Sequence, residues 1–396
     1  MVRTRVIEKV SDLERLVPAW RRLLSSAARA EPVSTPLWLL SWWRVFGEAD
    51  GRALRVLAVE DGGDLIGLVP LSWRNATHRR AIPVRRVELL ATGEDEADEI
   101  GSDYVGATVA PAREEEVACA IAHAIGHDLG DWDELRMTAM NGEDPFVDKL
   151  AGALRDSGVD ATLSPKVDAP YVSLPGAWEE YLRALGPTRR YAVTRSLREL
   201  EKWAGSRGWR LRTARTAEEL REGLRVLTEL HSERWSAAGR TGVFASERFA
   251  SFHDEVMPRL LAGEDGASLD LIWLVVGETP IAATYNVVFR NKIYFYQSGR
   301  RIDVPKAVRP GIAIHALAIR RAIESGRTEY DFLAGASRYK RDLALAVRPI
   351  VELRAVASTL RARAVEAARV LAERAIARIR ATRGAAPGAP EERAPE

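Results

Sequence analysis

Cysteine, histidine and methionine are scarce in this sequence. Its 396 residues include one cysteine, six histidines and four methionines, which excludes a disulfide framework and a multi-cysteine zinc site. The lone Cys119 is typical of a protein in a reducing compartment, and we expect a buried structural thiol there, not a nucleophile. His123 and His127 lack the glutamate and the third ligand of a zinc motif. We therefore predict that the protein holds no metal.

Long apolar runs and an excess of one charge are also missing. No segment approaches the roughly 20 apolar residues of a membrane-spanning helix, and the charged start MVRTRVIEKV lacks the apolar core of a signal peptide. The 58 basic and 56 acidic residues leave a net charge of +2, which argues against a DNA partner. We expect a globular protein of two or three domains in the cytoplasm.

The order of predicted elements repeats along the chain. Each half reads helix–helix–strand–strand–strand–helix–strand–helix–strand, with turns at Asp61–Asp64 in the first half and Gly277–Pro280 in the second. Residue identity between the halves is weak, so the match lies in element order and turn position. We predict an α+β fold of two copies, 1–165 and 166–356, each a mixed, mostly antiparallel sheet flanked by helices. The boundary is expected near 164–173.

A basic segment follows the second copy. We predict a basic amphipathic helix over 357–383 and a disordered tail over 384–396, where Gly, Ala, Pro and Glu dominate. Such a helix suits an anionic membrane surface. Packing against the protein itself, or against a second subunit in a homodimer, is an equally open interpretation.

The segment Arg309–Ala313 opens a predicted helix and has two interpretations. Free first-turn amides and the helix dipole suit an anion such as a pyrophosphate, and Arg309 would add a charge-assisted contact. Alternatively, Pro310-Gly311 is only a helix start signal. The counterpart in the first copy carries Glu114–Glu116, which would repel a pyrophosphate. We therefore predict that the first copy binds no cofactor and instead shapes the cleft for a second substrate, the acceptor.

Several motifs together resemble one family. The segments Thr279–Ala283 and Lys292–Gly299, the helix start Arg309–Gly311, and the segment Asp331–Lys340 are similar to the CelD/BcsL-type acetyltransferases. These belong to the GNAT superfamily and are related to the FemAB-like peptidoglycan transferases. His231–Trp235 is also similar to a family segment. First-half segments similar to the family are Ser34–Trp38, Trp42-Trp43 and Val69–Leu71.

The resemblance implies two tandem GNAT-like domains and direct acyl transfer to an amine. The co-substrate would be acetyl-CoA or another acyl-CoA, lying where two neighbouring parallel strands part, here 292–298 and 329–333. A backbone amide of the first strand would polarise the thioester carbonyl. One departure is that Ala336 and Ser337 stand where family members often have acidic residues.

The resemblance also implies which residues bind the co-substrate. These are Ser298, Arg309, Pro310, Gly311, Ile312, Ala313 and Lys340. Lys340 would bind a phosphate or an anionic acceptor. Its alternative is a place on a solvated helix face, which it would share with Tyr339.

Five residues are implied as catalytic candidates, each with a second interpretation. Asp331 would orient the amine or act as its base, or would cap the following turn. Tyr339 would protonate the departing thiolate. Tyr285 and Tyr296 would face the acceptor, or pack within the sheet. His231 would act as a base, or be a helix histidine with satisfied hydrogen bonds.

The acceptor is expected to be an amine on a small molecule, a sugar or a cell-envelope precursor. One alternative is a FemAB-like transferase that uses aminoacyl-tRNA, against which the near-neutral charge argues. Another is a catalytically inactive pair that acts as a binding or assembly factor in polysaccharide biosynthesis.

Overall fold

The chain folds into two compact units, which are described one at a time. The computed structural model describes residues 2–78, 81–335 and 337–382, so the predicted tail at 384–396 and Ala336 lie outside the described residues. Of the described residues, unit 1 comprises those up to 94, 100–166 and 349–382. Unit 2 comprises 95–99 and 167–348. The division falls within two strands that run from one unit into the other.

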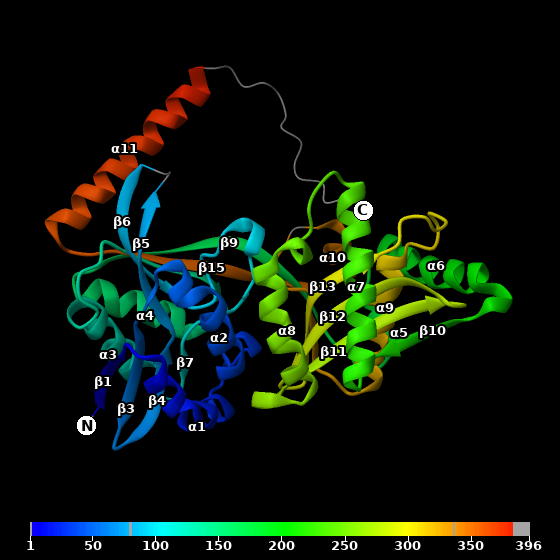
Figure 1. Ribbon diagram of the computed structural model, residues 1–396, viewed down its shortest axis with the longest axis horizontal. Helices are drawn as coiled ribbons and strands as arrows, with labels where there is room; N and C mark the ends of the chain where they lie inside the picture. The colour runs from blue at the N-terminus through cyan, green and yellow to red at the C-terminus, as the bar shows by residue number, and fades with distance from the viewer. Residues whose placement is uncertain (1, 79–80, 336, 383–396) are drawn as a thin grey trace. The chain divides into compact units, whose positions relative to one another are not determined.

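Unit 1 contains two groups of paired strands with helices beside them (Figure 1). One sheet has the order β1 (Val2–Ile7), β3 (Val56–Asp61), β4 (Asp64–Val69) and β7 (Thr108–Val109). The other strands follow the order β15 (Ala346–Val356), β8 (Glu134–Asn141), β6 (Ile82–Leu89), β5 (Leu71–His78) and β2 (Ala53–Leu54). The helices are α1 (Val10–Ser26), α2 (Pro36–Trp42), α3 (Glu114–His127), α4 (Pro145–Asp156) and α11 (Leu360–Thr382).

The prediction that Cys119 is a buried thiol was wrong. Helix α3 buries the side that carries residues such as Val117, Ile121 and Ile125. Cys119 lies outside this buried side and is exposed. Its helical position, and not its residue type, decides its burial.

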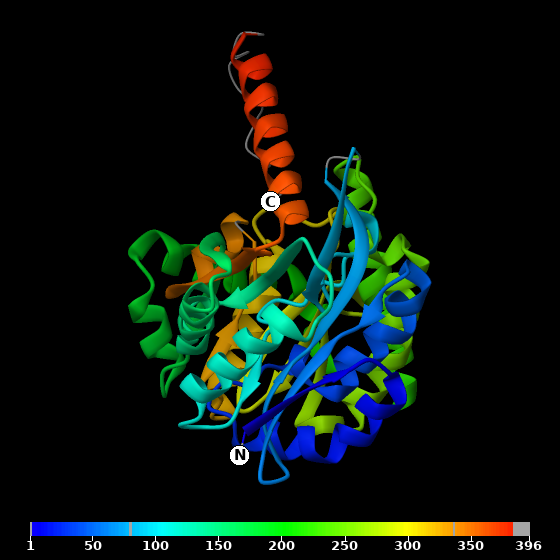
Figure 2. The same cartoon turned by 90° about the vertical axis from the view of Figure 1, so that its left-hand side faces the viewer.

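Helix α11 contacts unit 1 through its first turns and then extends away from the rest of that unit (Figure 2). Ala362 is buried, whereas Leu371 is 65% exposed. Arg361 pairs with Asp133 at 3.1 Å, so the start of the helix is held by its own unit. Contact with a membrane or a second subunit stays a prediction. Among the described residues, no helix has both the length and the apolar character to cross a bilayer.

Unit 2 is a six-stranded sheet between two helical layers (Figure 1). The strand order is β10 (Trp209–Thr213), β11 (Ala267–Val276), β12 (Thr279–Phe289), β13 (Lys292–Arg300), β14 (Glu329–Asp331) and β9 (Asp160–Ser173). One layer contains α5 (Trp178–Ala184), α6 (Pro187–Ala204) and α9 (Pro310–Glu324), with α10 (Arg338–Leu343) beside them. The other contains α7 (Ala217–Ala237) and α8 (Glu247–Leu261).

The core of unit 2 lies between the sheet and the layer of α5, α6 and α9. Tyr181, Leu200 and Ile319 reach it from these three helices, and Phe295 reaches it from β13. Helix α9 is apolar along most of its length because it is buried against this core. Its first turn is therefore held in a fixed place beside the end of β13.

Candidate functional site

Strands β13 and β14 run parallel but pair over only three positions, Lys292–Tyr294 against Glu329–Asp331. Beyond Tyr294, β13 continues to Arg300, whereas β14 has ended. The two backbones therefore separate in the second half of β13.

Gly299 lets this half of β13 approach helix α7 closely. A Cβ atom at position 299 would lie 2.4 Å from the backbone nitrogen of His231 and 2.8 Å from the carbonyl oxygen of Leu227. Real Cβ atoms do not approach backbone this closely, so only glycine fits here. The absence of a side chain brings the end of β13 against α7.

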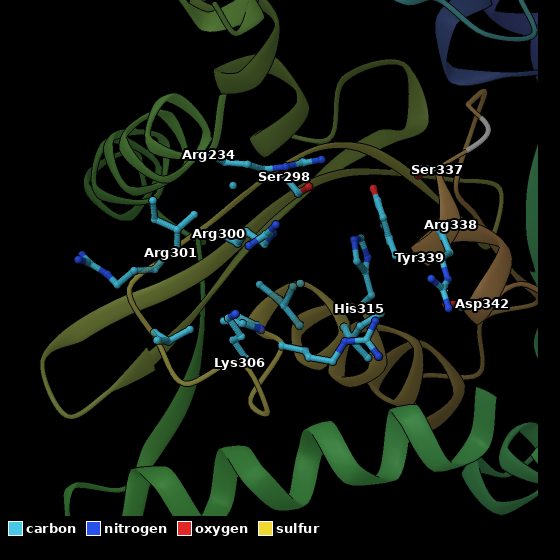
Figure 3. A pocket seen from close by; sticks show the side chains of 18 of the residues that line it. Arg234, Ser298, Arg300, Arg301, Lys306, His315, Ser337, Arg338, Tyr339 and Asp342 are labelled. Atoms are coloured by element: carbon cyan, nitrogen blue, oxygen red, sulfur yellow. The ribbon is translucent and has the colours of Figure 1, made fainter. Parts of the chain in front are cut away.

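A cavity of about 720 Å³ lies at the end of β13 (Figure 3). Its walls are formed by residues 298–302 of β13 and the following loop, the first turns of α9, the start of α10, and Arg234 of α7. The described basic side chains that line it are Arg234, Arg300, Arg301, Lys306, Arg309 and Arg338, and the acidic one is Asp342. This surplus of positive charge suits a polyanionic ligand.

The start of helix α9 faces the cavity. Arg309 adopts a left-handed backbone conformation, with φ 48° and ψ 66°, and no side chain caps the helix. The Arg309 carbonyl accepts hydrogen bonds from the amides of Ile312 and Ala313 at 2.9 and 3.1 Å. A Cβ at Gly311 would meet only the Arg300 Cδ, at 3.4 Å. The positive end of the helix dipole is thus open to an anion.

Tyr339 reaches the same cavity from helix α10. Its hydroxyl points toward Ser298 (Figure 3), whose side chain favours the ionised form of the phenol. Its ring stacks on His315 with centroids 5.3 Å apart. Burial raises the pKa of Tyr339, so this phenol is a proton donor at neutral pH.

His315 lines the cavity but escaped the sequence analysis. It is 1% exposed, and its Nδ1 lies 3.1 Å from the Tyr330 hydroxyl. Burial, together with the charges of Lys340 and Arg234, lowers the pKa of His315 to about 3, so the ring is neutral at pH 7. Its position four residues after Gly311 places it one turn into α9, on the face of the predicted anion site. That spacing was the available signal.

Partners of Tyr330 set the tautomer of His315. The Asn286 amide nitrogen donates to Asp270 Oδ2 at 3.0 Å, so its oxygen faces Tyr330 and accepts the Tyr330 hydroxyl proton, at 3.5 Å. Tyr330 has one proton to donate, so its oxygen accepts from His315 Nδ1–H. The Nε2 atom of His315 is therefore left with a free lone pair.

Five of the seven residues predicted to bind the co-substrate line the cavity, and Ala313 and Lys340 are not among the described residues that line it. Ser298, Arg309, Pro310, Gly311 and Ile312 line the cavity. Ala313 is fully buried. The Lys340 ammonium donates to the Ala334 carbonyl at 2.5 Å, which closes the loop before α10.

Asp331 is buried at the end of β14 and is 0% exposed. Its Oδ2 pairs with Arg348 at 2.7 Å, and its Oδ1 accepts from the Leu333 amide at 2.7 Å. Both oxygens are engaged, and the second contact agrees with the turn-capping interpretation. Its role as a base stays a prediction.

Tyr285, Tyr296 and His231 are not among the described residues that line the cavity. The Tyr296 hydroxyl lies 3.1 Å from His253 Nε2 on helix α8, and its ring lies 5.0 Å from that of Tyr285. His231 Nδ1 contacts the Ser298 carbonyl at 3.0 Å, and burial lowers its pKa to about 4. His231 thus contacts the backbone of β13 from helix α7. The proposed catalytic roles of Tyr285, Tyr296 and His231 stay predictions.

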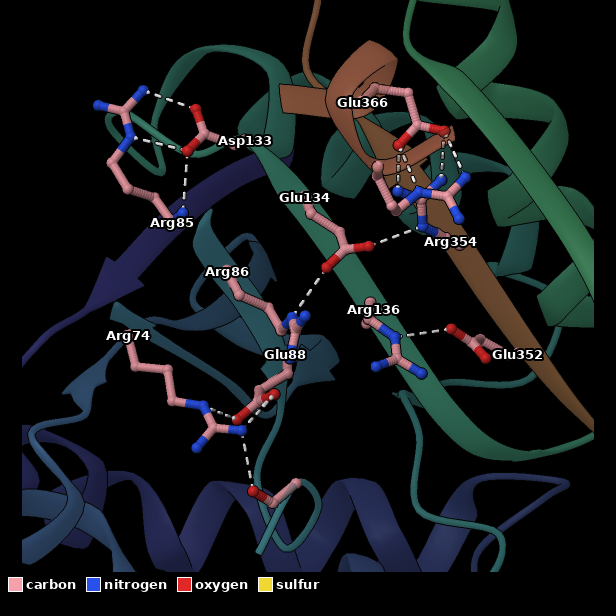
Figure 4. Close-up of polar contacts among 12 residues, drawn as sticks. Arg74, Arg85, Arg86, Glu88, Asp133, Glu134, Arg136, Glu352, Arg354 and Glu366 are labelled. Atoms are coloured by element: carbon pink, nitrogen blue, oxygen red, sulfur yellow. Dashed lines mark hydrogen bonds and ion pairs between the residues drawn. The ribbon is translucent and has the colours of Figure 1, made fainter. Parts of the chain in front are cut away.

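In unit 1, unlike in the cavity of unit 2, basic and acidic side chains form ion pairs with one another (Figure 4). Glu134 joins Arg86 at 2.8 Å and Arg354 at 2.7 Å. Arg85 pairs with Asp133 at 3.0 Å. In this network the guanidinium groups have carboxylate partners, which contrasts with the cationic lining of the cavity in unit 2.

The parted strands β13 and β14 beside an uncapped, cation-rich helix start agree with the co-substrate site that the resemblance to GNAT acetyltransferases implies. Residues 187–341 match the family model Acetyltransf_6, described as an acetyltransferase (GNAT) domain. The match supports acyl-transfer chemistry in general terms. A comparison with curated protein sequences finds no match.

Solved structures show the same fold over most of the chain. FemX aligns with a TM-score of 0.57 and 11% identity, over 89% of this chain and 96% of its own. A conserved protein of unknown function from Bacteroides thetaiotaomicron aligns with a TM-score of 0.51 and 9% identity, over 90% and 100%. The predicted tandem GNAT-like, FemAB-related fold is confirmed.

Proposed function

We propose that unit 2 transfers an acyl group from an acyl-CoA, with acetyl-CoA as the first choice, to an amine. The observation that carries the proposal is the coincidence of the parted strands β13 and β14 with the cationic start of α9. A diphosphate would bind at Gly311 and Arg309, supported by Lys306. The pantetheine arm would then run toward the end of β13, where a backbone amide of this strand would polarise the thioester carbonyl.

Two of the described residues would carry out the two proton transfers of such a reaction. As the amine nitrogen bonds to the carbonyl carbon and the carbon–sulfur bond breaks, Tyr339 would give its hydroxyl proton to the thiolate. The proton released by the amine would pass to Nε2 of His315, whose lone pair is free. Ser298 would orient the Tyr339 hydroxyl between these steps.

Acetyl-CoA is expected to bind the wild-type protein and to raise its Tm. Gly311→Glu is expected to weaken binding by about 100-fold or more, because it replaces an open anion site with a carboxylate (about 2.7 kcal/mol). Gly311→Ala is the matched control and should stay within about threefold, because its Cβ meets only the end of one flexible side chain. Isothermal titration calorimetry measures all three.

Two outcomes would count against the proposal. If acetyl-CoA has no effect but charged tRNA stabilises the protein, the FemAB-like alternative is favoured. If neither donor has an effect, an inactive pair with a binding or assembly role is favoured. Equal affinity of the wild type and Gly311→Glu would show that acetyl-CoA binds elsewhere.

A further inference from the structure

Three arginines that line the cavity, Arg234, Arg300 and Arg309, have no carboxylate partner within the described residues. Arg234 of α7 and Arg300 at the end of β13 both line it. By contrast, Arg301 lies 3.6 Å from Asp303. The Arg234 guanidinium instead packs over the Trp235 ring at 5.6 Å, and its Nε is buried without a hydrogen bond.

The positive charges of Arg234 and Arg300 repel each other in a partly buried environment. Burial lowers the pKa of Arg300, and the charge of Arg234 lowers it further. Unpaired cations in such a place cost stability unless a ligand satisfies them. An anion bound between them would gain two charge-assisted hydrogen-bonding partners and would remove their mutual repulsion.

Arg234 lies apart from the predicted diphosphate site, whereas Arg300 reaches toward it, because a Cβ at Gly311 would lie 3.4 Å from the Arg300 Cδ. Arg234 comes from α7, in the helical layer opposite α9. In Figure 3 it lies beside Ser298, while Lys306 lies across the cavity near the start of α9. Arg234 also acts electrostatically on Tyr339 and His315. Arg234 is therefore next to the groups assigned to proton transfer, on the side away from the donor's phosphates, and Arg300 lies between the two sites.

We propose that Arg234 and Arg300 bind an acidic group, a carboxylate or a phosphate, on the amine acceptor. This inference rests on the proposed function and narrows its acceptor to an amine that also carries an anion. It has a consequence for His315. Because the charge of Arg234 lowers the pKa of His315, a bound anion would offset that charge and make the imidazole a better proton acceptor.

The test separates this site from the donor site with simple anions as probes. Inorganic phosphate and succinate are titrated into the protein saturated with acetyl-CoA, and Tm is followed. One of them is expected to add a further stabilisation, and which one does so distinguishes a phosphate from a carboxylate. Arg234→Gln is expected to weaken that anion about tenfold or more while keeping acetyl-CoA affinity within about threefold. Arg300→Gln is expected to weaken the same anion about tenfold or more.

Two variants provide the contrast. Arg309→Gln should weaken acetyl-CoA about tenfold and keep the anion response. Arg225→Gln, on the same helix as Arg234 but 60% exposed, should change neither and controls for folding. The proposal is overturned if Arg234→Gln weakens acetyl-CoA as much as Arg309→Gln does, since the pair then serves the donor. It is also overturned if both anions stabilise every variant equally or stabilise none.

The same titration without acetyl-CoA keeps the two proposals distinguishable. If the wild type does not bind acetyl-CoA, the proposed function fails. The anion site itself still stands if phosphate or succinate stabilises the wild type and Arg225→Gln but not Arg234→Gln, and it fails if that difference is missing.

Discussion

Replacing Arg348 with methionine is expected to lower the free energy of unfolding by about 3–5 kcal/mol. Arg348 is 3% exposed and pairs with Asp331 at 2.7 Å and with Glu329 at 3.0 Å. Its guanidinium also packs over the Tyr171 ring at 4.3 Å. Methionine fills much of the same volume but leaves two buried carboxylates without this cation, so the cost is that of uncompensated charge.

Urea denaturation measures this loss, and two further variants identify its cause. Arg225→Met breaks an exposed pair with Glu229 and should cost about 0.5 kcal/mol or less. Adding Asp331→Asn to Arg348→Met should recover part of the stability, because it removes one of the stranded charges. A loss below about 1 kcal/mol in Arg348→Met would contradict the expectation that burial makes this pair costly to break.

Acid is expected to destabilise unit 2 steeply between about pH 6.5 and pH 4. Burial lowers the pKa of His231 to about 4 and the pKa values of His253 and His315 to about 3, against about 6.5 for a histidine in the unfolded chain. As the pH falls below 6.5, the unfolded state binds protons that the folded state excludes. The stabilisation is therefore full above pH 6.5 and is lost toward pH 4.

Each of these histidines contributes a slope of about 1.4 kcal/mol per pH unit, and the three together about 4. Urea midpoints at several pH values measure the slope. His315→Gln should reduce it by about a third, whereas His127→Gln, at an exposed position, should leave it unchanged. A profile that is flat over this range, or one that His315→Gln does not alter, would show that these rings take up protons in the folded state.

Much of the candidate site was predictable from local signals. The strands 292–298 and 329–333, and the helix start after Arg309, follow from residue periodicity and from the Pro310-Gly311 pair. Ser298 and Gly311 line the cavity because they stand at the ends of these elements. Such signals depend on neighbours within a few residues, so they can be detected in a single sequence.

The remaining residues of the site could not be found in this way. From the sequence alone, a histidine on an apolar helix is interpreted as a buried core residue. The partners that set the tautomer of His315 come from strands β14 and β12. Arg234 stands within a recognised segment, but only the folded structure reveals that it lines the cavity without a carboxylate partner among the described residues. Asp331 is a candidate base in the sequence, and its pairing with Arg348 is visible only in the folded structure.

Periodicity and turn chemistry along the chain were thus sufficient to predict an α+β fold of two copies and the helix start after Arg309, because both arise from short-range backbone preferences. The resemblance of several motifs added the prediction of a tandem GNAT-like fold. The folded arrangement alone decided which side chains are buried, which charges find partners and which ring nitrogen keeps a free lone pair. These properties depend on contacts between residues far apart in the chain, because such contacts determine which groups lose water and which find hydrogen-bond partners.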